Sequence, residues 1–279
     1  MAGSFSNSIA LVKASANVLR LDKELMVFPL MSGIATVLVT ASFVVPFVVT
    51  GGFQVFPEGS GASYLTYVLG FLFYLAQYTV IFFFNSALVG AALIRLGGGD
   101  PTVGDGLAIA SKRVGTIVGY AAIAATVGMV LRFISERGGL VARLASGFAG
   151  MAWTLATYLA VPILVTKNIG PIDAVKESAA LFKRTWGEQV VGNFGMGAVM
   201  FLAGLSWAAV SVALVMGASS IAPQAMVGAI GIAVLGFAFL GLIGSALNGI
   251  YTAALYRYAM TGEAGYFDSG IMGSAFRPK

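Results

Sequence analysis

The sequence predicts an all-α protein that crosses a membrane six times. Of its 279 residues, 58% are hydrophobic and only 10% are charged, whereas a soluble domain carries about 25% charged residues. Five long stretches contain no Asp, Glu, Lys or Arg: 25–57, 59–94, 114–131, 144–166 and 189–256. A membrane-spanning helix needs about 20 apolar residues. Continuous apolar runs of this length fit helices better than the short alternating segments of barrel strands.

These runs define the individual spans. The last run is too long for one helix and breaks at GASSIAPQ, residues 217–224, where Gly, Ser and Pro indicate a turn. We therefore expect the spans at 26–50, 64–94, 114–132, 145–166, 189–216 and 226–256. The first apolar run is too long for the core of a signal peptide, so this span is expected to remain in the mature protein.

Positive charge is divided unevenly between the two sides that six spans create. One side holds the N-terminus, residues 95–113, residues 167–188 and the C-terminus, and it carries 13 of the 16 Lys and Arg residues. Because short cytoplasmic loops are enriched in Lys and Arg, we expect both termini in the cytoplasm. The expected location is the plasma (inner) membrane.

Three arginines are exceptions to this charge rule. Arg132, Arg137 and Arg143 lie in the loop expected between the third and fourth spans, on the outer side. They could form a cationic outer lip that attracts anions. Alternatively, they could be interfacial arginines that reach toward lipid phosphates, which is common behaviour at helix ends. The second interpretation is favoured.

An amphipathic stretch precedes each pair of spans. Within 171–186, four apolar residues recur at helical spacing and form one stripe, while charged residues occupy the remaining surface. A short basic amphipathic helix with an aromatic residue is expected to lie flat at the membrane surface. We call such a helix an elbow.

The elbow pattern recurs along the chain. It is found 72 residues earlier, at 101–113, and in a looser form at 5–20. Corresponding residues are Asp105 and Glu177, and Lys112 and Arg184. Such periodicity indicates internal repeats. We predict one transmembrane domain built from three parallel repeats, each an elbow followed by a two-span hairpin, with a cytoplasmic tail at 257–279.

The basic ends of the elbows are candidate contacts for lipid headgroups. These residues are Lys112, Arg113, Lys183, Arg184 and Trp186. Each Lys or Arg close to an anionic membrane surface contributes about 1 kcal/mol. Anionic membrane lipids are therefore the expected partners. The net charge of +5 follows the membrane surface, so nucleic acid is not an expected partner.

Amide side chains form a candidate polar seam within the spans. They are Gln77, Asn85, Asn193 and Asn248. No charged residue lies near the centre of any expected span, which disfavours ion-coupled transport. The amides could join helices by hydrogen bonds, or they could line a path for a solute or water. Packing is the favoured interpretation.

The composition also argues against catalysis. Cys and His are absent, so the chain lacks thiolate nucleophiles, the commonest metal ligand and the commonest general base. We predict no catalytic residue, cofactor or metal site.

Two segments resemble a family of uncharacterised prokaryotic six-span membrane proteins. They are VLRLDKELMVFPLMSG at 18–33, where the first span begins, and ALYRYAMTGEAGYFDSGIMGSAFRPK at 254–279. The overall layout is also similar to the membrane domain attached to some glycerophosphodiester phosphodiesterases. The resemblance implies an integral membrane protein without an established activity. It transfers no functional residue and no phosphodiesterase reaction.

Two functions remain open from the sequence. The favoured one is a non-enzymatic membrane protein that contacts lipids as an organiser or accessory subunit, either as a homo-oligomer or with a partner membrane protein. The alternative is a passive channel or transporter-like permeation protein for a small solute or ion.

Overall fold

Helices make up nearly all of the residues that the structure describes, and these residues include no strand. The computed structural model describes residues 2–49, 60–186, 195–263 and 265–267. The helices that are long and apolar enough to cross a membrane are Lys23–Pro46, Tyr67–Leu96, Val114–Glu136, Gly139–Thr166, Met196–Ser219 and Pro223–Thr261. The prediction of an all-α membrane protein with six candidate spans is confirmed at this level.

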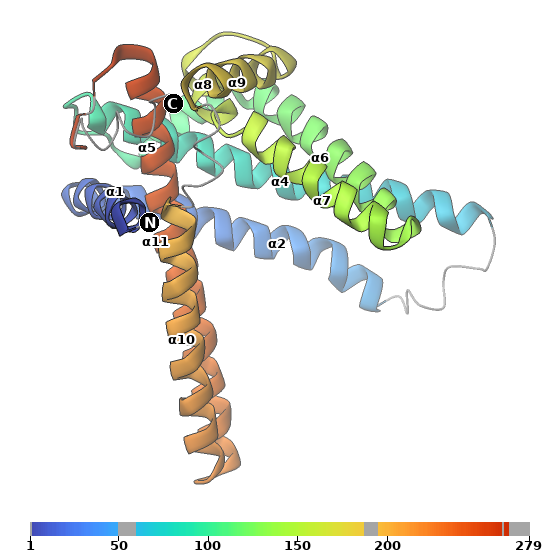
Figure 1. Ribbon diagram of the computed structural model, residues 1–279. Coiled ribbons are helices and arrows are strands. Elements are labelled where there is room, and N and C mark those ends of the chain that lie inside the picture. Colours follow the sequence, from blue (N-terminus) through green and yellow to red (C-terminus); the bar gives the residue numbers. More distant parts are fainter. Residues whose placement is uncertain (1, 50–59, 187–194, 264, 268–279) are drawn as a thin grey trace.

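A packed end carries two arms that extend in different directions (Figure 1). In chain order, the helices are α1 (Ala2–Leu21), the 3-10 helix η1 (Lys23–Met26), α2 (Val27–Val49), α4 (Ser60–Leu96), α5 (Val103–Lys112), α6 (Val114–Arg137), α7 (Gly139–Ala156), α8 (Ala160–Thr166), α9 (Pro171–Trp186), α10 (Gly195–Ser219) and α11 (Pro223–Thr261). We call the packed end the base. It comprises α1, η1, α5, α8 and α9, together with α4 from Ser86 onward and α11 from Ala246 onward. The first arm is α2, α6, α7 and the rest of α4, and the second arm is α10 and the rest of α11.

The base contains most of the buried apolar residues. In α4 the buried residues lie between Ser86 and Leu96, and in α11 most residues between Ala246 and Tyr256 are buried, with Asn248 exposed. The short helix α8 is buried from Ala160 to Leu164. These three segments pack against one another and are covered by the elbows. The second span of each hairpin thus ends inside a common core.

The three helices predicted as elbows pack in a regular order. Helix α5 packs on α4, and α9 packs on α7 and α8. Helix α1 packs on α10 and α11. Each of α5 and α9 therefore covers the hairpin that precedes it in the chain, and α1 covers the last hairpin.

The arms are much less buried than the base. Phe201 of α10 and Val227 of α11 are 65% and 69% exposed. In a membrane protein such apolar faces contact lipid tails. Helix α10 packs mainly on α11 and α1, so the second arm is held mainly by its own hairpin and the base.

Close contacts join the two helices of the second arm. A Cβ atom at Gly236 would lie 2.1 Å from the ring of Trp207, and one at Gly244 would lie 2.9 Å from Met200. The Trp207 indole N–H also donates to the carbonyl of Ala233 at 3.0 Å. Small residues in α11 therefore admit the bulky side chains of α10.

The fourth span differs from the uninterrupted helix expected over 145–166. Helix α7 ends at Ala156 and α8 begins at Ala160. Pro162 has no N–H to donate to the carbonyl four residues earlier, which favours a break at this point. The buried N–H of Leu159 instead donates to the hydroxyl of Ser178 in α9, at 3.0 Å. An elbow residue thus satisfies the backbone at the break.

The connection between the third and fourth spans is also more helical than expected. Helix α6 continues to Arg137, and α7 begins at Gly139. The chain reverses at Gly138 and Gly139, and Gly139 has a φ of +65°, a conformation that glycine adopts readily. The charges at 132–143 suggested a loop, but exposed charged side chains are compatible with the end of a helix.

Candidate functional site

The candidate seam residue Gln77 joins α4 to α2. Its side-chain amide donates to the hydroxyl of Thr40 at 2.7 Å and to the carbonyl of Thr36 at 3.3 Å. The carbonyl oxygen of Gln77 is buried and has no hydrogen-bond partner in the described part of the chain. The donor group of Gln77 therefore serves helix packing.

The other seam residues do not share this environment. The Oδ1 atom of Asn85 lies 3.6 Å from the position that a Cβ atom at Gly249 would occupy, so Asn85 borders α11. Asn248 is exposed. Asn193 lies outside the described residues. Of the candidate seam residues that the structure describes, Asn85 lies at a contact between α4 and α11.

The candidate lipid contacts lie on the base. Lys112 and Lys183 are exposed at the ends of α5 and α9. Arg113 is half-buried and donates a hydrogen bond to the side-chain oxygen of Asn168, so it joins the start of α6 to the loop between α8 and α9. The side chains of Arg184 and Trp186 lie outside the described part of the structure.

The three arginines predicted for the outer side lie around the reversal between α6 and α7. Arg132 forms an ion pair with Glu136 at 2.7 Å and donates to the Tyr74 hydroxyl of α4 at 2.9 Å. Arg143 is exposed on α7, and the side chain of Arg137 lies outside the description. Arg132 therefore links two spans of the first arm.

A polar junction in the base was not predicted from the sequence. Asp22 lies between α1 and η1, and its side chain is only 4% exposed. Arg95 at the end of α4 forms an ion pair with Asp22 at 3.3 Å and a second ion pair with Asp100. A buried carboxylate needs such a partner. The sequence shows an acid, Asp22, just before the first expected span and a cation, Arg95, at the end of the second. It gives no further indication that the two residues pair.

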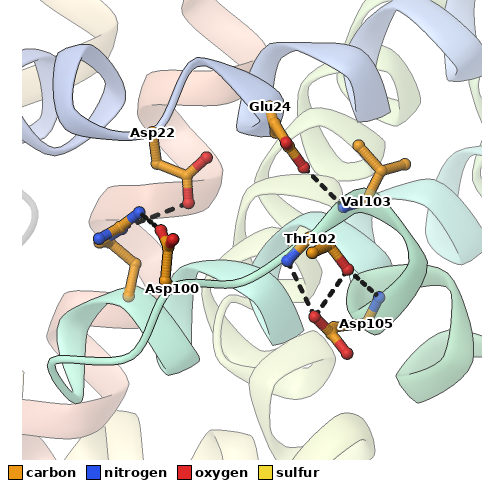
Figure 2. Close-up of polar contacts among 7 residues, drawn as sticks. Asp22, Glu24, Asp100, Thr102, Val103 and Asp105 are labelled. Carbon is orange, nitrogen blue, oxygen red and sulfur yellow. Dashed lines mark hydrogen bonds and ion pairs between the residues drawn. The ribbon is translucent and has the colours of Figure 1, made fainter.

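The same junction fixes the start of α5 (Figure 2). Glu24 accepts a hydrogen bond from the N–H of Val103 at 2.9 Å. Thr102 and Asp105 form a capping box, in which each side chain accepts from the backbone N–H of the other residue. The backbone N–H and hydroxyl of Thr102 lower the pKa of Asp105 below its ordinary value. The chain before the first span thereby holds the second elbow in place.

Each hairpin ends in a cation that is paired with an acid. Arg95 has its two aspartates, Lys167 pairs with Glu177 of α9, and Arg257 pairs with Glu263 at 2.7 Å. The hydrogen bond to Glu177 raises the pKa of Lys167. These cations therefore form ion pairs within the base.

The arrangement of the described residues offers structural ion pairs. No set of three or more Asp or Glu side chains is placed to hold a metal ion within the described ranges. The chemistry that these residues provide is charge pairing at the base and hydrogen bonding between spans.

Residues 64–266 match a family of unknown function, DUF6159. The chain belongs to this family. Searches of curated proteins and of solved structures found no match. The family assignment agrees with the resemblance to uncharacterised membrane proteins, whereas the likeness in layout to the phosphodiesterase membrane domain stays a prediction.

Proposed function

We propose that this DUF6159 protein is a non-enzymatic membrane organiser or accessory subunit whose base contacts anionic lipid headgroups. The observation that carries the proposal is a division among the cations of the base. Arg95, Lys167 and Arg257 are paired with acids. On the base, the exposed cations without an ion-pair partner among the described residues are Lys13, Arg20, Lys23, Lys112 and Lys183. Unpaired cations at a membrane surface favour anionic lipid.

The orientation follows from the same charges. Lys and Arg concentrate on the side of the membrane where the base lies, and such an excess favours the cytoplasm. We therefore place the elbow helices of the base and both termini on the cytoplasmic side. A membrane-impermeant thiol reagent tests this orientation because the chain has no native cysteine. Exposed probes are Ser111→Cys on the base and Ser219→Cys at the tip of the second arm. Labelling of Ser219→Cys only from the cytoplasmic side would contradict the assignment.

We also propose that the chain consists of three repeats of an elbow and a hairpin. The packing order of α1, α5 and α9 supports the repeats. So do Arg95 and Lys167, which are 72 residues apart, because both end a second span and pair with an acid. The repeat period found for the elbows thus extends to the hairpin ends.

The intramembrane amides favour this function over permeation. Gln77 bonds to Thr36 and Thr40, which accounts for its donor group. Asn248 lies on the exposed face of α11. These positions support packing, because a solute path would require the amides to face a shared interior.

The lipid proposal is tested by neutralising two exposed cations together. Lys112→Gln with Lys183→Gln should reduce the phosphatidylglycerol that remains bound after purification, because each cation contributes about 1 kcal/mol at an anionic surface. We expect a loss of at least several-fold. The matched control is Arg143→Gln, which removes an exposed cation at the opposite end of the spans. Equal retention by the double variant and the parent protein would reject headgroup contact at these residues.

A further inference from the structure

Neighbouring hairpins are packed to different extents. Helix α4, the second span of the first hairpin, packs along α6, the first span of the next hairpin. The ring centroids of Phe82 and Tyr120 lie 4.6 Å apart. The Tyr78 hydroxyl lies 3.5 Å from the position that a Cβ atom at Gly128 would occupy. If the three repeats are arranged in a ring, α11 should meet α2 in the same way. Helices α11 and α2 do make contact, but they diverge as they leave the base (Figure 1).

Helix α11 has a second face with small and polar residues. Gly236 and Gly244 face α10, whereas no atom lies within 4 Å of where a Cβ atom at Gly241 would be. Ser245 and Asn248 follow Gly241 at helical spacing and are exposed. Small residues and amides are typical of helix contacts in membranes. Large apolar residues alone would suffice for a face that meets only lipid.

The divergence of the arms also conflicts with a single bilayer. Membrane helices tilt by about 20° on average, within a range of roughly 0–40°. Two arms that leave the base in different directions cannot both lie close to the bilayer normal. Movement of the second arm toward the first reduces the tilt that each arm requires.

We propose that the second arm closes onto the first in the bilayer, with α11 packing along α2 through the face that contains Gly241. This proposal rests on the three-repeat arrangement and not on lipid binding. The closed form repeats the α4–α6 contact between the third and first hairpins. Opening and closing would expose or cover the facing surfaces of α2 and α11 while the base stays packed.

Spin labels on the cysteine-free chain test the closure. The labelled positions are Val45→Cys in α2 and Val227→Cys in α11. The native side chains Val45 and Val227 are 54% and 69% exposed and lie toward the far ends of the arms. In lipid nanodiscs we expect one short label distance, consistent with helix axes about 8–10 Å apart. Val45→Cys with Leu72→Cys is the positive control, because α2 and α4 already pack together. A Val45–Val227 distance as long as the diverging arms imply would overturn the proposal.

Two further measurements identify the contact. Dilution of the labelled protein with unlabelled chain leaves an intramolecular distance unchanged. Loss of the short distance on dilution would show that a second copy fills the gap and would reject closure within one chain. Gly241→Leu should restore the long distance, whereas Gly228→Leu, at another open position on α11, should not. Full closure of Gly241→Leu would overturn the assigned face. None of these outcomes depends on phospholipid retention.

Discussion

The base and the arms of this protein are stabilised in different ways. The base combines a buried apolar core, ion pairs at the hairpin ends and a capping box at the start of α5. The arms expose large apolar side chains along most of their length. In lipid, apolar burial provides little drive for helix association, and close packing and hydrogen bonds dominate. The comparison indicates that the base determines the stability of the fold, whereas the arms are free to differ in arrangement.

A single helix illustrates the contrast. Within α11, a Cβ atom at Gly249 would lie 2.4 Å from Leu88 of α4, whereas one at Gly241 would meet no atom within 4 Å. The two glycines are only eight residues apart. The same residue type is therefore constrained where α11 packs on α4 and unconstrained on the open face of the arm that contains Gly241.

The largest effect should come from the buried ion pair of the base. Arg95→Met leaves Asp22 buried without its cation, and breaking such a pair costs about 3–5 kcal/mol. Arg132→Met removes an arginine from an ion pair in the first arm, but Arg132 is 63% exposed, so we expect a far smaller loss of stability because solvent screens the pair. Thermal unfolding in detergent measures both. The double variant Arg95→Met with Asp22→Leu should recover much of the loss. Equal melting temperatures for the two single variants would break the comparison.

A smaller effect is expected from adding one methyl group in the base. A Cβ atom at Gly106 would lie 2.4 Å from Phe28 and 2.7 Å from the carbonyl oxygen of Ala87. Gly106→Ala should therefore destabilise the protein by about 2–3 kcal/mol through overpacking. Gly197→Ala in α10 meets no atom within 4 Å and should stabilise the helix by up to about 1 kcal/mol. Chemical denaturation measures the free energy of unfolding of both variants. A change of the same sign in the two variants would argue against different packing at Gly106 and Gly197.

The break in the fourth span provides a third test. Ser178→Ala removes the acceptor for the buried N–H of Leu159, and an unsatisfied buried donor costs about 1–2 kcal/mol. Ser219→Ala, at an exposed position near the tip of the second arm, should change stability by less than about 0.5 kcal/mol. Hydrogen exchange should show faster exchange at Leu159 in the first variant alone. Unchanged protection there would mean that the hydroxyl does not hold the break.

The smallest effects are expected from the amides in the membrane. Intramembrane hydrogen bonds average about 0.6 kcal/mol, so Asn85→Leu and Asn248→Leu should each cost little stability. Reconstituted parent protein should leave vesicles as impermeable to small solutes and ions as protein-free lipid. Solute flux in the parent that either substitution abolishes, with folding intact, would instead support a permeation path.

The sequence indicated exposed cations at the ends of two helices and missed the polar contacts of the base for a physical reason. The exposed cations Lys112 and Lys183 were identified because amphipathic spacing is local. The pair formed by Asp22 and Arg95 spans 73 residues, and the bond between Leu159 and Ser178 depends on how α9 folds back over α8. Neither contact has a local pattern that would reveal it.

The sequence by itself determined the helical class, the number of candidate spans and the amphipathic helix at 171–186. Lipid requires long apolar helices with internally bonded backbones, so length and composition are sufficient for those features. Tertiary structure alone decided that the second spans end in a shared core, that Asn248 is exposed and that the two arms diverge. Apolar faces that meet lipid and apolar faces that meet another helix have similar compositions, because lipid tails and apolar side chains are nearly equivalent surroundings. Composition therefore cannot assign neighbours, and only the packing of the folded chain does.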